Sequence, residues 1–214
     1  MNGPDTWSAR HLKAAARHAF PVVKRLRALR AEIGMDHEAW AAYCVGLGWY
    51  GREREALEII GRAAGLLWPV RMTCAAAALL SPSTYWGALK SRLPGFLAAA
   101  LAGDPCPTFP AYGQNRTAAA RVVCTGNFDR MGPKVGPFYA AIMGDPGAVV
   151  IDRHTCRQAI GTDVPSASER RAIVLAFWIV GASIGVAPAA LQAGLWTARV
   201  GPDGLAPGRK ARAL

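Results

Sequence analysis

The chain has 214 residues, of which 52% are hydrophobic and 18% are charged, and its formal net charge at pH 7 is +11. This composition favours one globular domain with a hydrophobic core and excludes an intrinsically disordered chain. The positive charge predicts a polyanionic partner, with nucleic acid the first expectation and an anionic lipid surface the second. Twenty of the 25 basic residues are arginine, which suits phosphate binding but is also what a GC-rich genome produces.

Residues 1–18 lack the apolar stretch of a signal peptide, so we expect a cytoplasmic protein. The five cysteines are scattered and form no C-x-x-C pair, which predicts reduced thiols and neither a disulfide framework nor a metal site. The most apolar run, 172–187, is shorter than the ~20 residues that cross a bilayer. We interpret it as a buried helix and expect no membrane partner.

Apolar residues recur at intervals of three and four along nearly the whole chain, which predicts an all-α fold. We expect a single helical domain of two lobes over 1–200, followed by a flexible basic tail over 201–214. The expected helices are 6–19, 22–33, 37–46, 52–66, 70–80, 84–101, 114–124, 134–143, 153–160, 168–186 and 189–200.

Several helix starts carry a capping signal. Asp36 precedes one helix, Ser166 and Glu169 form a capping box, and Pro188 suits a first helical turn. The expected connectors are rich in proline and glycine, and they are 46–51, 81–84, 103–113 and 144–147.

The helical pattern breaks between Asp129 and Arg157. This stretch predicts a turn at Met131 and Gly132, a helix, a Gly-Asp-Pro-Gly turn, and an extended apolar run over 148–151. Asp152 then opens the next helix, eighteen positions after Lys134. We expect this arrangement to aim the Asp152 carboxylate back toward the turn.

The order of turn, G-x-K, helix, apolar run and I-D-x-H resembles the helix-hairpin-helix (HhH-GPD) DNA glycosylase superfamily. Members of that family are all-α, flip a nucleotide out of DNA, and cleave the bond between base and deoxyribose. In the bifunctional branch a lysine attacks the sugar C1′ and an aspartate supports the developing charge. The resemblance implies these roles for Lys134 and Asp152.

Weaker similarity extends upstream, so that the resemblance covers about 75–160. Residues 74–96 are similar to a wall of the base pocket, and residues 112–123 to the segment before the hairpin. The first hairpin helix is shortened here, and Arg130 stands where the family has its first glycine. Phage enzymes that build hypermodified thymines are also similar.

The candidate site residues fall into three sets. Lys134 and Asp152 are the candidate catalytic pair, because desolvation near a helix start activates an amine and a carboxylate stabilises an oxocarbenium-like sugar. Backbone and guanidinium groups are expected to bind phosphate at Gly132, Val135, Gly136, Arg116 and Arg130. The base pocket is expected to include Ser81, Thr84, Tyr85, Trp86, Tyr139 and His154.

Structural readings of the same residues stay open. Asp152 is also a typical N-cap, and Lys134 could point into water. Residues 81–84 also suit a turn that ends a helix, and His154 could bond locally. The arginines Arg116, Arg121 and Arg130 could form a solvated face.

We expect a monomer that binds duplex DNA and needs no cofactor. Three functions are compatible with this expectation. The first is a glycosylase acting on a modified or damaged flipped base, with Asp152 essential and Lys134 a possible Schiff-base nucleophile. The second is a phage-type enzyme that transfers an amine to an activated thymine. The third is a non-catalytic DNA-binding protein.

Overall fold

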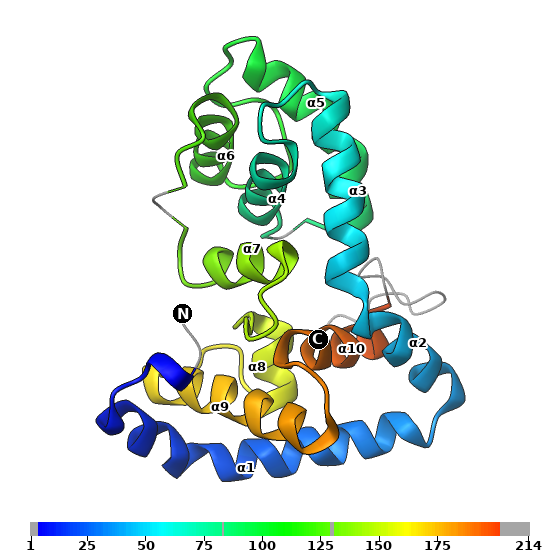
Figure 1. Ribbon diagram of the computed structural model, residues 1–214, viewed down its shortest axis with the longest axis vertical. Helices are drawn as coiled ribbons and strands as arrows, with labels where there is room; N and C mark the ends of the chain where they lie inside the picture. The colour runs from blue at the N-terminus through cyan, green and yellow to red at the C-terminus, as the bar shows by residue number, and fades with distance from the viewer. Residues whose placement is uncertain (1–3, 83, 129–130, 202–214) are drawn as a thin grey trace.

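The structure is a computed structural model that describes residues 4–82, 84–128 and 131–201 (Figure 1). Over these residues the chain is helical and contains no β-strand, which confirms the predicted all-α class. Arg130 and the tail from residue 202 onward, about which the sequence made predictions, lie outside the described residues.

Ten α-helices follow a short 3-10 helix in the described chain. They are α1 (Ala9–Gly34), α2 (His37–Leu47), α3 (Trp49–Ala63), α4 (Pro69–Leu80), α5 (Trp86–Leu101), α6 (Gly113–Thr125), α7 (Val135–Met143), α8 (Arg153–Ile160), α9 (Ala167–Ile184) and α10 (Pro188–Val200), after η1 (Pro4–Thr6).

The prediction of two helices over 6–19 and 22–33 is wrong, because α1 runs through both. Pro21 lies inside α1, where its missing N–H and its ring normally break a helix. One apolar face continues across the proline and is buried, so packing against α9 holds the helix together. That face consists of Ala15, Ala19, Val22, Val23, Leu26, Leu29 and Ile33.

The predicted capping signals are confirmed. The Asp36 carboxylate accepts a hydrogen bond from the Ala39 N–H at 3.0 Å. Ser166 and Glu169 form a reciprocal capping box at the start of α9, and Pro188 occupies the first turn of α10. These local signals set where three helices begin.

The helices form two groups, each around its own hydrophobic core (Figure 1). The central group, α3 to α7, encloses a core in which α4 is buried on nearly every side. The terminal group consists of α1, α2 and α8 to α10, with α1 packed on α9 and α2 packed on α10. Helix α10 serves both, since Ala193 lies in the first core and Leu195 in the second.

Candidate functional site

The segment that joins the two groups is clamped by one buried side chain. Residues 148–151 lie between α7 and α8, belong to no helix and are buried. The Val150 N–H donates to Gln192 Oε1 at 2.8 Å, and Gln192 Nε2 donates back to the Val150 carbonyl at 2.6 Å. The amide therefore satisfies this backbone as a neighbouring strand would. Gln192 Nε2 also donates to Thr155 Oγ1 at 2.7 Å, which ties the segment to α8.

Asp152 follows this clamped segment and is the N-cap of α8. Its Oδ1 accepts a hydrogen bond from the Thr155 N–H at 2.8 Å. The side chain is half-buried, and no described residue donates a hydrogen bond to its second oxygen, Oδ2. One carboxylate oxygen thus fixes the helix start while the other stays available as an acceptor.

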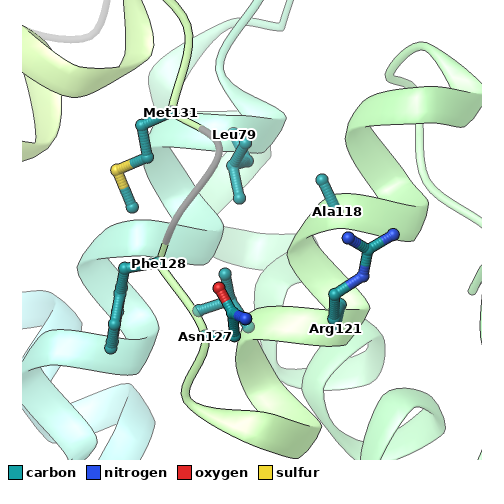
Figure 2. A pocket seen from close by; sticks show the side chains of 7 residues that line it. Leu79, Ala118, Arg121, Asn127, Phe128 and Met131 are labelled. Carbon is teal, nitrogen blue, oxygen red and sulfur yellow. The ribbon is translucent and has the colours of Figure 1, made fainter.

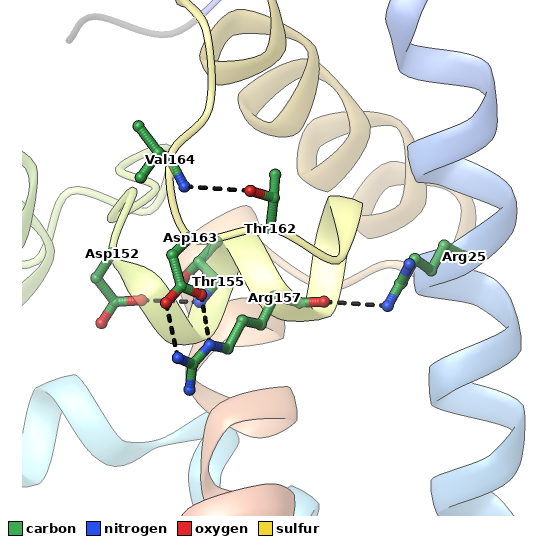
Figure 3. A network of polar contacts seen from close by, with 7 residues as sticks. All are labelled: Arg25, Asp152, Thr155, Arg157, Thr162, Asp163 and Val164. Atoms are coloured by element: carbon green, nitrogen blue, oxygen red, sulfur yellow. Dashed lines mark hydrogen bonds and ion pairs between the residues drawn. The ribbon is translucent and has the colours of Figure 1, made fainter. Parts of the chain in front are cut away.

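The far end of α8 is held by charged side chains (Figure 3). Arg157 forms a two-pronged ion pair with Asp163, in which Nη2 lies 2.7 Å from Oδ2. Arg25 from α1 donates to the Arg157 carbonyl at 3.1 Å. The hydrogen bond from Arg157 lowers the pKa of Asp163, and Arg153 and His154 add smaller contributions. These contacts fix the orientation of α8 and with it the place of Asp152.

The Asp152 carboxylate raises the pKa values of two side chains, Tyr50 in the central group and Cys156 in the terminal group. Burial raises the pKa of Tyr50, on α3, above its usual range, and the Asp152 carboxylate raises it further. The Tyr50 ring packs edge-on against Phe138 of α7 with centroids 6.2 Å apart. Burial also raises the pKa of the Cys156 thiol to about 11, with Asp152 the second cause. The carboxylate therefore acts electrostatically on α3 as well as on its own helix.

Lys134 lies at the N-cap of α7 and is half-buried. Within the described residues it forms no ion pair, and no hydrogen bond joins it to Asp152. Its carbonyl accepts from the Phe138 N–H at 3.2 Å, so Lys134 and the ring that meets Tyr50 share one helical turn. The structure thus places Lys134 and Asp152 at the starts of two consecutive helices, α7 in the central group and α8 in the terminal group (Figure 1).

The turn before α7 uses part of its backbone internally. The Gly136 N–H donates to the Gly132 carbonyl at 2.9 Å, so this N–H is already occupied rather than open to a phosphate. Gly132 is exposed and Val135 is half-buried. Arg116 lies in the first turn of α6, at the other end of that helix from the connector to α7, and donates to the Pro107 carbonyl at 3.4 Å.

The residues predicted as a base-pocket wall lie between α4 and α5. Ser81 is the C-cap of α4 and donates to the Ala78 carbonyl at 2.9 Å, as expected of a helix-ending turn. Thr84 Oγ1 donates to the Pro110 carbonyl at 2.8 Å and ties two connectors together. Tyr85 is 55% exposed, and His154 is exposed on α8.

Trp86 is not the exposed ring that stacking on a flipped base requires. It is 5% exposed in the core of the central group, where its ring meets Trp49 and Phe138. The sequence predicted a helix from residue 84, and Trp86 does begin α5, but its ring is buried rather than exposed. Tyr139 is half-buried and stacks on Phe128 with centroids 5.9 Å apart.

A buried carboxylate that sequence reasoning missed explains why Trp86 faces inward. Glu53, on α3, is 8% exposed and accepts hydrogen bonds from Trp86 Nε1 at 2.7 Å and Lys90 Nζ at 2.8 Å. Tyr50 and Gln192 were missed as well. The one available signal for Gln192 was a polar side chain inside the apolar run of α10.

A small pocket lies between α4, α6 and the connector to α7 (Figure 2). Its volume of about 20 Å³ holds one water molecule and is far too small for a nucleobase. It is lined by Leu79, Ala118, Arg121, Val122, Asn127, Phe128 and Met131.

The described part of the chain holds neither a cluster of metal-binding side chains nor a clear membrane span. Over 4–82, 84–128 and 131–201, no group of three or more His, Cys, Asp or Glu side chains is placed to hold a metal ion. In the same residues no single helix is long and apolar enough to cross a membrane, and α9 with α10 meets that test only as a pair bent by 95°.

Most of the chain matches a known protein family. Residues 38–202 match the model of a family described as a family of unknown function, DUF7178. This span runs from the second residue of α2 beyond the end of α10 and leaves α1 outside. No curated protein and no solved structure matches the chain.

Proposed function

The chain belongs to the DUF7178 family, and we propose that it is a DNA glycosylase-like enzyme that acts on a flipped, modified or damaged base. The proposal depends mainly on one observation. Asp152 is held by a buried clamp and a helix cap, yet keeps one carboxylate oxygen without a described donor at the boundary between the helix groups.

This carboxylate suits the chemistry of glycosidic bond cleavage. When the bond between base and C1′ breaks, the base leaves with the bonding electrons and the sugar becomes oxocarbenium-like. A fixed negative charge near C1′ stabilises that transition state more than the neutral ground state, which is what accelerates the reaction. Asp152 supplies such a charge without having to reorganise, because Gln192 and the Thr155 N–H already hold its position.

Lys134 is the candidate nucleophile for a lyase step. Its Nζ would bond to C1′ as the base departs, and loss of the amine protons with opening of the sugar ring would leave an imine. The net charge of +11 supports binding of the DNA that carries the sugar. Lys134 is half-buried and without an ion pair to any described residue, so its amine is not already committed to a carboxylate.

Base release from a panel of modified duplexes, measured by mass spectrometry, tests the role of Asp152. We expect the wild type to release a base and Asp152→Asn to lose at least a hundredfold in rate, an order of magnitude typical of a lost electrostatic stabiliser. Asp36→Asn is the matched control, because Asp36 caps α2 in the same manner. Equal rates for both variants would overturn the proposal, and so would the absence of release by the wild type.

Borohydride trapping tests Lys134 separately. The reagent reduces an imine to a stable amine, so a protein–DNA adduct is expected from the wild type. Lys134→Arg keeps the positive charge but cannot form the imine, and we expect no adduct from it. An adduct of equal yield would show that another amine attacks, while Asp152 could still act alone.

A non-catalytic DNA-binding protein is the second candidate, and the buried Trp86 favours it because this ring cannot stack on a flipped base. In that case DNA binding persists in the wild type, and no base or co-substrate product is detected. Release of a base without any co-substrate would count against both this candidate and the thymine-modifying alternative.

A further inference from the structure

Helix α1 carries a row of basic residues on the face opposite its core contacts. Positions 10, 13, 17, 20, 24 and 27 alternate by three and four, so they fall within an arc of about 100° at 3.6 residues per turn. Five of these positions carry a positive charge and the sixth is an exposed phenylalanine. We call the residues Arg10, Lys13, Arg17, Phe20, Lys24 and Arg27 the α1 stripe.

The charges of the α1 stripe are exposed and uncompensated within the described structure. All five basic side chains are exposed, and none forms an ion pair with a described residue. The one acidic residue of α1 is Glu32, which pairs with Arg199 at 3.0 Å. Phe20, in the middle of the row, is 76% exposed. The stripe is therefore a continuous field of one sign.

The fold holds the α1 stripe rigid and turned outward. The opposite face of α1 is buried against α9 and α8, and Arg25 links α1 to the end of α8. In Figure 1, α1 lies along the outer edge of the terminal group, on the side away from α7. The row thus lies apart from Lys134, and it is not a part of the candidate active site.

We propose that the α1 stripe binds the phosphate backbone of duplex nucleic acid as a second contact surface. From Arg10 to Arg27 the row is about 25 Å long at 1.5 Å per residue. A duplex presents one negative charge per about 1.7 Å of its axis, so each of the five cations can reach a phosphate over that length. Guanidinium groups, which three of the five carry, suit phosphate oxygens.

The geometry of α1 disfavours an anionic membrane as the partner. A helix that lies in a membrane interface inserts an apolar face and keeps its basic face toward the headgroups. The apolar face of α1 is buried against α9, and only Phe20 offers an exposed apolar side chain on the stripe. Helix α1 therefore exposes no apolar face that could insert into a membrane.

The α1 stripe lies outside the part of the chain that matches the family model. Helix α1 ends before residue 38, where the match to the family model begins. The α1 stripe accordingly would add DNA affinity to the matched part, independently of the chemistry proposed for Asp152.

Salt-dependent binding to an unmodified duplex of about 20 base pairs, followed by fluorescence anisotropy, tests the inference. All proteins carry Asp152→Asn, so that turnover plays no part and failure of the proposed enzymatic activity leaves the result intact. The stripe variant replaces Arg10, Arg17 and Arg27 by glutamine. The control replaces Arg52, Arg62 and Arg92, exposed arginines of the central group, by glutamine, with the same change in net charge. Thermal melting checks that each variant folds.

We expect the stripe variant to bind the duplex at least tenfold more weakly at 0.1 M salt. The slope of log K against log salt should become shallower by about 2.7, because each of the three lost phosphate contacts contributes about 0.9. The control should change the slope by less than about one. Equal losses in the two variants, or unchanged binding in the stripe variant, would overturn the proposal. Vesicles of phosphatidylserine and phosphatidylcholine provide a second arm. Stripe-dependent binding to them, with duplex binding equal in all proteins, would assign the surface to lipid and also overturn it.

Discussion

Two carboxylates near the boundary of the helix groups are held in opposite ways. Glu53 lies inside the central group, and its hydrogen bonds come from Trp86 and Lys90 on α5, more than thirty residues away in sequence. Asp152 bonds the Thr155 N–H, three residues further along its own helix, and Oδ2 has no donor among the described residues. The first carboxylate joins two helices, whereas the second caps one.

This difference separates a structural carboxylate from one that can serve a ligand. The buried Glu53 carboxylate stabilises the fold only while Trp86 and Lys90 both donate to it. A cap interaction uses one oxygen and contributes about 1 kcal/mol, so it tolerates a second partner. The sequence pointed to Asp152 and not to Glu53, and substitution of each carboxylate and of its partners distinguishes the two roles.

Glu53→Ala should have the largest effect on stability. It leaves the Lys90 ammonium and the Trp86 indole N–H without their acceptor in a buried site, which costs about 3–5 kcal/mol. Urea unfolding followed by tryptophan fluorescence measures the change. Glu55→Ala, an exposed neighbour on α3, should stay within about 0.5 kcal/mol. Similar midpoints for the two variants would show that Glu53 is not structural.

Gln192→Ala should have the next largest effect. It leaves the Val150 N–H without an acceptor in a buried site, at an order of 1–3 kcal/mol for one buried group, and removes one of the two donors to the Val150 carbonyl, which keeps the Asp152 N–H at 3.2 Å. Because the clamp also places Asp152, base release should fall in folded protein as well. Gln114→Ala, exposed on α6, is the control for both measurements. Loss of stability with full activity would show that the clamp does not position Asp152.

Alanine in place of either capping aspartate should cost a similar, smaller amount. Asp152→Ala and Asp36→Ala each remove one cap hydrogen bond, and each should lower the free energy of unfolding by about 1 kcal/mol. Only Asp152→Ala should reduce base release. A loss above about 3 kcal/mol for Asp152→Ala would place Asp152 with Glu53 among the structural carboxylates.

The smallest effect on the fold is expected for Asp152→Asn, as a shift in the ionisation of the Cys156 thiol. The pKa of Cys156 is raised to about 11 by burial first and by Asp152 second, so removing the charge lowers this pKa but leaves it above its ordinary value. In the wild type the thiol stabilises the fold below pH 9 and loses that contribution as the pH rises toward about 11. In Asp152→Asn the loss should be complete at a lower pH. Alkylation of Cys156 between pH 8 and 11, read by peptide mass spectrometry, measures the shift, and superimposable profiles would contradict it.

Local signals were sufficient for much of the fold. Helix starts at Asp36, Ser166 and Pro188 were predicted correctly, because a cap is made by residues within one turn of each other. Local signals failed at Pro21, where they predicted a break. Burial of the α1 face against α9, more than 130 residues later, outweighed the local cost of the proline.

The same division applies to the candidate site. The sequence by itself determined an all-helical chain, the break between the helices at 148–151 and a capping aspartate at 152, since each depends on periodicity or on neighbours along the chain. Only the tertiary structure decided that Gln192 clamps Val150 and that Trp86 turns inward to Glu53. Those pairings join residues 42 and 33 positions apart, and a buried polar group has to find its partner wherever the packed helices bring one within reach.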